Sequence, residues 1–319
     1  MALPPSPMQG GYVHDNTTER SANESSAPGV LGELKLSDWM WILTMLIALI
    51  GLVGNSIVLW LLGFRIKRNP FSVYILNLAG ADALFLCFSF LVSIPEFVRY
   101  LCNSFMHKLL QYVAYTFYTL SLSLLAVIST ERCLSVLFPI WYRCHRPKHT
   151  SVVMCAVLCT LASLFCVVGF LNCIYGPNHF CTNFFIIEFM WFIALTCGLC
   201  MSSLTLLLRV QCSSQSQQAP RLYLVILLTV LVFLLCGLPM EIGEFASRFN
   251  IVSMPQWLHQ LLACVNSSAN PFIYFFLGRQ MHKKREPLRV VLQSVLGGKQ
   301  DLVDGKRDIA HIDTPEPSF

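Results

Sequence analysis

Residues 128–143 read ISTERCLSVLFPIWYR, and this stretch ends a long apolar segment with an acid, Glu131, directly beside an arginine, Arg132. An arginine at the rim of a lipid-spanning helix is costly unless it reaches water, a partner or a functional cavity. The stretch therefore predicts that the preceding segment crosses a membrane and that Arg132 has a functional contact at the membrane edge.

The composition favours a membrane protein. Hydrophobic residues make up 55% of the 319 residues and charged residues only 12%, whereas an average soluble domain is about 25% charged. No region combines a basic face with regularly spaced stacking aromatics, so nucleic acid is not expected as a partner. Most of the 14 cysteines lie in apolar segments, where a lone cysteine behaves as a small hydrophobe.

Seven long apolar runs follow the first 38 residues. Each exceeds the roughly 20 residues that a helix needs to cross a hydrocarbon core of about 30 Å. None alternates strictly, as the strands of a membrane barrel do, so the pattern predicts an all-α membrane protein built as a bundle of seven transmembrane helices. The predicted spans are residues 39–63, 70–94, 109–138, 151–172, 185–208, 222–245 and 256–277.

The distribution of lysine and arginine predicts the orientation in the membrane. One set of loops and the tail after residue 278 hold most of these residues; the loops are 64–69, 139–150 and 209–221. The opposite loops hold only Arg99, Lys108 and Arg248. We therefore expect a multi-pass protein of the plasma membrane with an extracellular N-terminus and a cytoplasmic C-terminus.

Both ends of the chain are polar. Residues 1–38 are expected to be a disordered extracellular tail, glycosylated at the sequons of Asn16 and Asn23. The basic cluster and the helical spacing of apolar residues in 278–296 predict an amphipathic helix that lies on the lipids of the cytoplasmic leaflet. The alternative is that this helix packs its apolar stripe against the bundle. Residues 297–319 are expected to be a disordered cytoplasmic tail.

A small set of polar residues lies inside the predicted spans, where polar groups are costly. These residues predict one buried network around a single carboxylate, although they could also simply hold helices together. They are Asn55, Asp82, Ser121, Asn266, Ser267 and Asn270.

Several of these positions belong to motifs that resemble the rhodopsin-like G-protein-coupled receptors. The motifs include Asn55, Asp82, Glu131-Arg132-Cys133 and the run Asn270-Pro271-Phe272-Ile273-Tyr274. A more specific resemblance is to the Mas-related receptor family. It is carried by residues 60–64, 74–79, 129–145, 227–239 and 266–276.

The resemblance implies a cell-surface receptor, with residues 39–277 as its seven-helix domain. Such a receptor binds an extracellular ligand, a peptide or a small charged molecule, and activates a heterotrimeric G protein. By this resemblance Arg132 reaches the G protein when the sixth helix swings out, and Glu131 holds it at rest as an adjacent ion pair. Cys133 fits the Mas-related pattern.

The resemblance also assigns roles to the sixth and seventh spans. Pro239 kinks the sixth helix because it removes a backbone hydrogen bond. Asn270, Pro271 and Tyr274 belong to the switch in the seventh.

Asp82 would line a sodium pocket together with the hydroxyls and amides of the network, an oxygen cage suited to a hard cation. This allosteric sodium ion is the only cofactor that the resemblance implies.

The usual disulfide of the superfamily cannot form, because His107 stands at its position on the third span. The Mas-related family instead joins the end of the fourth helix to the start of the fifth, and Cys173 and Cys181 match those positions. Two free thiols are the alternative.

The nature of the ligand is less determined. Ala114 replaces the aspartate of amine receptors, and no acid stands where some Mas-related receptors grip basic peptides. Glu241 and Glu244 share one helical face with Gly237 by spacings of four and three residues. We expect this face to receive a positive ligand group. For Glu244 the alternative is a local pair with Arg248, one turn away.

Residues 209–240 contain no acid, so the inner part of the sixth span offers no carboxylate to restrain Arg132. This predicts a ligand-independent signal, and an orphan receptor that signals mainly through basal activity is one alternative reading. A membrane transporter is another, although no inverted repeat supports it. An enzyme is not expected, because no catalytic set of serine and histidine lies at helical depth.

Overall fold

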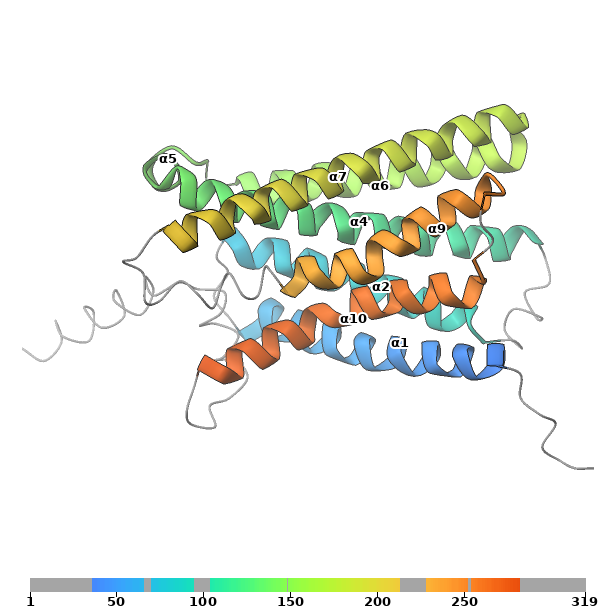
Figure 1. Ribbon diagram of the computed structural model, residues 1–319, viewed down its shortest axis with the longest axis horizontal. Coiled ribbons are helices and arrows are strands. Elements are labelled where there is room, and N and C mark those ends of the chain that lie inside the picture. Colours follow the sequence, from blue (N-terminus) through green and yellow to red (C-terminus); the bar gives the residue numbers. More distant parts are fainter. Residues whose placement is uncertain are drawn as a thin grey trace, which may run out of the picture. The chain divides into compact units, whose positions relative to one another are not determined.

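The computed structural model describes residues 36–65, 70–94, 104–147, 149–212, 228–251 and 254–281. Within these ranges every regular element is a helix (Figure 1). The predicted all-α fold is therefore confirmed for the described residues.

The helices follow the predicted spans closely. In chain order they are α1 (Leu36–Trp60) with the π-helical turn η1 (Leu61–Arg65), α2 (Pro70–Val92), α4 (Ser104–Leu137), the short α5 (Pro139–Cys144), α6 (Thr150–Tyr175), α7 (Asn178–Cys212), the π-helical turn η2 (Phe233–Gly237) with α9 (Leu238–Arg248), and α10 (Gln256–Met281). A helical segment that begins at Leu228 leads into η2 and α9 as one span.

Six of these helices are long and apolar enough to cross a membrane. The last helix, α10, has a sufficient length of 26 residues. Its hydropathy is lowered by a buried polar face that includes Asn266, Ser267 and Asn270. Among the seven predicted spans, α10 contributes most residues to the polar network and is the one that hydropathy identifies least clearly in the described residues.

The third span, α4, is the most deeply buried of the six. It contacts α2, α6 and α7 and extends over 34 residues, which corresponds to about 50 Å at 1.5 Å per residue. In contrast, α6 exposes Val153, Leu164 and Val167, as expected for a helix that faces lipid.

Two helices begin earlier than hydropathy indicates. α4 begins at Ser104 rather than near residue 109, and α7 begins at Asn178 rather than near residue 185. Polar residues in these first turns remain helical because water at the membrane boundary can solvate them. Only Gly176 and Pro177 separate α6 from α7.

The disulfide implied by the resemblance is present. Cys173 in α6 and Cys181 in α7 are bonded, and their Cα atoms are 4.7 Å apart. The bond ties the end of one span to the first turn of the next. Cys102 lies outside the described residues.

Other predictions also fall outside the described part of the chain. They concern the glycosylation of Asn16 and Asn23, most of the amphipathic helix of residues 278–296, and the tail of residues 297–319. These remain predictions.

α1 and α10 approach closely at Gly51. A Cβ atom at this position would overlap with Ser268 Oγ and lie 2.7 Å from Ser268 Cβ and 2.9 Å from Leu86 Cδ1. The same contact region contains a hydrogen bond in which Asn55 Nδ2 donates to the Ser267 carbonyl oxygen at 3.2 Å. The absence of a side chain at Gly51 therefore permits the helix contact that sets the position of the polar face of α10.

We predict that Gly51→Ala lowers the melting temperature of the purified protein in detergent. Overpacking costs about 1–3 kcal/mol and outweighs the helix-propensity gain of about 1 kcal/mol. The matched control is Gly198→Ala, because a Cβ at Gly198 meets no atom within 4 Å. Equal melting temperatures for the two variants would contradict this view of the contact.

Candidate functional site

The buried carboxylate of Asp82 in α2 is held by two other helices. Ser121 Oγ in α4 donates a hydrogen bond to Asp82 Oδ1 at 2.6 Å, and Asn270 Nδ2 in α10 donates to Asp82 Oδ2 at 2.8 Å. All three side chains are at most 3% exposed. The sequence therefore predicted correctly that these residues, 188 positions apart at the extreme, form one cluster.

The remaining members of the predicted network are buried nearby in the contact of α1 and α10. Asn55 Nδ2 donates to the carbonyl oxygens of Gly51 at 3.0 Å and Ser267 at 3.2 Å. Asn266 and Ser267 are at most 2% exposed. Among the described residues, Asn55 Oδ1 and Asn266 Nδ2 have no hydrogen-bond partner.

This donor set fits a hard monovalent cation in its chemistry. It offers one carboxylate and several neutral oxygens, which are the ligands that hard cations prefer. Within the described residues no group of three or more His, Cys, Asp or Glu could hold a metal ion. A transition-metal site is therefore not indicated in this part of the chain.

At the other end of α4, Glu131 accepts hydrogen bonds from three side chains. The donors are Tyr74 Oη in α2 at 3.1 Å, Tyr142 Oη in α5 at 2.9 Å and Arg146 Nε at 3.1 Å. Arg146 also forms an ion pair with Glu131, and both side chains are almost buried, 6% and 12% exposed respectively. A further bond of 2.8 Å runs from Arg146 Nη2 to Ser151 Oγ in α6.

Glu131 thus links its own helix, α4, to α2 and α5 directly and to α6 through Arg146. Burial, together with the neighbouring Glu131 carboxylate, raises the pKa of the Tyr142 phenol, so this group remains a hydrogen-bond donor at neutral pH. The arrangement fixes the short helix α5 against α2, α4 and α6.

The expected ion pair between Glu131 and Arg132 remains a prediction, and the structure shows a further contact for each of the two residues. Glu131 pairs with Arg146, whereas the Arg132 guanidinium carbon lies 3.3 Å from the centre of the Phe71 ring in α2. Adjacent residues of a helix point about 100° apart and do not face each other. The neighbours in sequence therefore contact different parts of the bundle.

The helix around Pro239 is irregular. The π-helical turn η2 covers Phe233–Gly237 and ends directly before Leu238 and Pro239. Such turns widen a helix locally and are common where helices bend at functional sites. Gly237 is buried, and a Cβ there would lie 2.8 Å from Phe233 Cδ2 and 3.3 Å from Tyr118 Oη.

The other residues assigned to the switch lie in packed surroundings. Tyr274 is 5% and Cys133 8% exposed. Pro271 lies inside α10 and faces α1 at Gly54, where a Cβ would be 3.2 Å from Pro271 Cβ. Their roles in coupling remain predictions.

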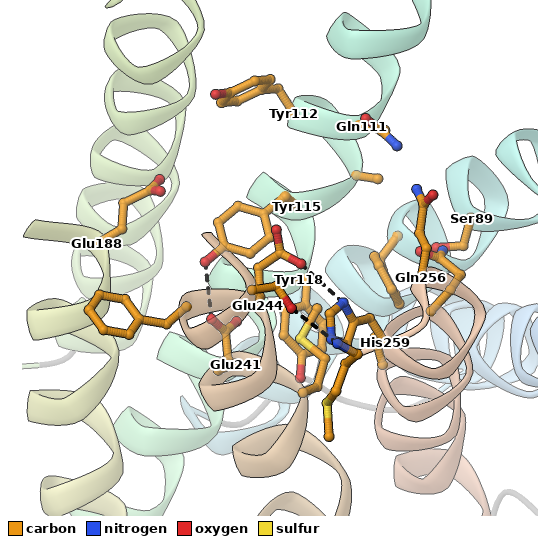
Figure 2. A pocket seen from close by; sticks show the side chains of 18 of the residues that line it. Ser89, Gln111, Tyr112, Tyr115, Tyr118, Glu188, Glu241, Glu244, Gln256 and His259 are labelled. Carbon is orange, nitrogen blue, oxygen red and sulfur yellow. Dashed lines mark hydrogen bonds and ion pairs between the residues drawn. The ribbon is translucent and has the colours of Figure 1, made fainter. Parts of the chain in front are cut away.

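A cavity of about 400 Å³ opens between α2, α4, α7, α9 and α10 (Figure 2). This volume lies in the range usual for small-molecule sites. Its walls are rich in aromatic side chains, among them Tyr112, Tyr115, Tyr118, Phe189 and Phe245.

Three acids line this cavity, and its described lining includes no lysine or arginine. The acids are Glu188 from α7 and Glu241 and Glu244 from α9. Both predicted acids of the sixth span, Glu241 and Glu244, thus line the cavity, and their role in ligand binding remains a prediction. Gly237, which was placed on the same face, is not part of the lining and lies beside Tyr118 instead.

Glu241 is only 4% exposed and is oriented by α4. Tyr115 Oη donates a hydrogen bond to Glu241 Oε2 at 3.1 Å, as Figure 2 shows. A buried acid held by a neutral donor at the wall of a cavity can receive a positive charge.

Glu244 is more accessible, with 46% of its side chain exposed, and its Oε2 lies 3.1 Å from His259 Nδ1. His259 is in the first turns of α10 and is 7% exposed. His259 thus lies at the end of the last span and lines the cavity. The alternative partner of Glu244, Arg248, has a side chain outside the described part.

Near the positions where the resemblance implies acids that grip basic peptides, the chain has Gly169 or Phe170 and Phe185 or Ile186, none of which is acidic. A Cβ at Gly169 would overlap with the ring of Phe184. Phe170 makes edge-on ring contacts with Phe105 and Tyr112, and Phe185 lines the cavity. The acids of this cavity come from α7 and α9 instead.

Four residues that contact Glu131 or Glu241 in these sites were not predicted from the sequence. They are Tyr74, Tyr115, Tyr142 and Arg146. Tyr115 and Glu241 are 126 positions apart, and no local pattern connects them. Arg146 counted only as one of several loop charges. The one usable signal was Glu131 itself, since a carboxylate at the membrane edge requires a cation or hydroxyl donors within reach.

Comparisons with known proteins agree with this geometry. Residues 54–274 match the family described as "7 transmembrane receptor (rhodopsin family)". Mas-related G-protein coupled receptor member X2 of Gorilla gorilla gorilla is 43% identical over 318 residues, which cover 95% of this chain and 93% of the relative. The receptor of the same name from Macaca mulatta is 43% identical over 322 residues, with the same coverage.

The human receptor of this name is 43% identical over 298 residues, or 87% of this chain and 86% of the relative. These relatives are receptors, which agrees with the expectation that the chain is not an enzyme. The matched region spans the Asp82 cluster, the Glu131 cluster and the acidic cavity. The chain therefore belongs to the Mas-related G-protein-coupled receptors of the rhodopsin family.

Proposed function

We propose that this receptor binds a positively charged extracellular ligand in the cavity at Glu241 and activates a heterotrimeric G protein through the opposite, Arg132 end. The carrying observation is a buried carboxylate in an aromatic cavity whose described lining contains no lysine or arginine. An ionisable side chain within a membrane bundle is costly and is by default a functional site.

The chemistry of the cavity favours ammonium or guanidinium groups. Glu241 supplies a carboxyl group, and the aromatic residues of the wall, such as Tyr112 and Tyr115, supply rings of the kind that attract cations. Glu188 adds negative charge from α7. Basic peptides and small amines both carry such groups, and the cavity volume of about 400 Å³ accommodates a side chain or a small molecule.

We predict that Glu241→Gln lowers the potency of cationic agonists roughly 10- to 100-fold, since a hydrogen bond to a charged group contributes about 1.5–3 kcal/mol. A screen of basic peptides and amines with calcium and cyclic AMP readouts supplies the agonists. The control is Asp38→Asn, at the first turn of α1. Unchanged responses of Glu241→Gln to every cationic agonist would refute the ligand role.

The proposed inner end rests on the charge distribution and on the Glu131 cluster. The loop that follows α4 carries Arg143 and Arg146, and basic loops favour the cytoplasm. Glu131 is bonded to Arg146, Tyr74 and Tyr142, so its carboxylate helps to hold α5 in place. Residues 209–240 contain no acid, so the inner part of the sixth span supplies no carboxylate to Arg132.

We predict ligand-independent signalling above that of untransfected cells, at verified surface expression. Ala219 shortly precedes the predicted sixth span of residues 222–245, and the resemblance places the acid that usually restrains the arginine near this position. Introducing a carboxylate there with Ala219→Glu should therefore lower the basal signal. Second-messenger levels are the measurement, and Ala219→Gln is the matched control of similar size. Basal levels equal to those of untransfected cells would argue against the proposal.

We also propose that Asp82 binds an allosteric sodium ion with Ser121 and neighbouring oxygens. The bound ion would supply a positive charge that compensates the buried carboxylate. The contacts among α2, α4 and α10, which meet at Asp82, would then be stabilised.

We predict that sodium chloride, compared with choline chloride, raises the melting temperature of the purified receptor. Asp82→Asn should abolish this difference because it removes the charge that attracts the ion, whereas Asp38→Asn should retain it. A sodium effect of the same size in Asp82→Asn would place the ion elsewhere.

A further inference from the structure

A second, smaller cavity adjoins the ligand cavity. It has a volume of about 30 Å³ and lies between α4, α6 and α7, with Glu241 of α9 at its border. Tyr115, Glu188 and Glu241 line both cavities. The two cavities therefore meet at the hydrogen bond from Tyr115 Oη to Glu241 Oε2 (Figure 2).

Away from this junction the wall of the small cavity is largely apolar. α6 and α7 contribute aliphatic and aromatic side chains, among them Leu158, Ala162, Phe165, Phe192 and Leu195. Leu158 is 8% and Phe192 is 4% exposed, so these parts of the wall are well packed. The volume of the cavity is close to that of one water molecule in the liquid, about 30 Å³, so the cavity has room for a methyl-sized group but not for a ring.

α4 adds three hydroxyl groups to this wall, and each of them donates within its own helix. Thr116 Oγ1 donates to the Tyr112 carbonyl oxygen at 2.8 Å, Thr119 Oγ1 to that of Tyr115 at 3.0 Å, and Ser123 Oγ to that of Thr119 at 2.8 Å. A buried water needs two to four polar partners, and these hydroxyl groups have already used their protons. The small cavity therefore suits an apolar group better than a water molecule.

We propose that the small cavity is a side pocket of the ligand site, which takes a small apolar branch of the ligand while the positive group of the ligand lies at Glu241. This inference rests on the proposed role of Glu241. Because Glu241 borders both cavities, the branch that enters the side pocket is attached to the carbon atom that carries the charged nitrogen. The remainder of the ligand lies in the larger cavity.

This arrangement distinguishes mirror images of a branched amine. With the nitrogen at Glu241 and the bulk of the ligand in the larger cavity, the carbon between them directs its branch into the side pocket in one enantiomer. In the other enantiomer a hydrogen atom points there instead. Burial of one additional methyl-sized group corresponds to about a fourfold gain in affinity.

The test uses purified full-length receptor in detergent and three probes, benzylamine and the two enantiomers of 1-phenylethylamine. All three carry one ammonium group at neutral pH. The enantiomers have the same charge, size and hydrophobicity, so a difference between them reports on the shape of the site. Dissociation constants come from the rise in melting temperature as each amine is titrated.

One enantiomer should bind about fourfold more tightly than the other enantiomer and than benzylamine. Ala162→Leu and Leu195→Phe fill the side pocket from α6 and α7, and neither residue lines the larger cavity. Each variant should remove the difference between the enantiomers and still bind benzylamine, which also shows that the variant is folded. The control is Ala156→Leu, at an exposed position of α6 outside both linings, which should retain the difference.

Equal affinities of the two enantiomers for the unmodified receptor overturn the side pocket. A difference that persists in both filled variants, or in Glu241→Gln, also overturns it, since the branch or the nitrogen then lies elsewhere. Loss of benzylamine binding in both filled variants does the same, because the small cavity is then part of the packing that holds Glu241.

The outcome for the proposed function is separate. If the enantiomers bind equally and Glu241→Gln still weakens benzylamine, the proposed function stands without the side pocket. If none of the three amines raises the melting temperature and Glu241→Gln changes nothing, both proposals fail.

Discussion

The structure depends on how each carboxylate inside the membrane bundle is compensated. A charged or polar group in this environment must find a partner on a neighbouring helix, because lipid offers none. Asp82 is bonded to Ser121 and Asn270, Glu131 to Arg146 and two tyrosines, and Glu241 to Tyr115. Each acid thereby joins helices that are distant in sequence, and the acids mark the positions at which the bundle is held together by polar contacts.

The long helix α4 participates in all three clusters. Tyr115, Ser121 and Glu131 lie along it in that order, with axial separations of about 9 Å and about 15 Å at 1.5 Å per residue. The cavity, the Asp82 cluster and the Glu131 cluster therefore lie at three levels along one helix. The π-helical turn η2 precedes Pro239 beside this helix, and Gly237 approaches Tyr118 of α4. A ligand that changes the contact between α4 and α9 can thus shift populations at the Glu131 end of α4.

Glu131 and Arg132 are adjacent in sequence but contact different neighbours in the bundle. The Glu131 carboxylate fixes α5 to α2, α4 and α6 through Tyr142, Tyr74 and Arg146, and Arg132 lies over Phe71. Glu131 and Arg132 therefore make different contacts at this end of α4. This separation follows from the 100° rotation between adjacent helical residues, which sends the two side chains to different neighbours.

Much of this bundle could be predicted from the amino-acid sequence. Hydropathy and helical periodicity predicted the helical spans and the shared face of Glu241 and Glu244, and the motif resemblance implied the disulfide of Cys173 and Cys181 and the grouping of Asp82 with Asn270. The pairing of Glu131 with Arg146, the bond from Tyr115 to Glu241 and the contact of His259 with Glu244 became apparent only in the folded bundle. These contacts depend on the rotation and depth of one helix against another. Periodicity within a single helix contains no information about those quantities.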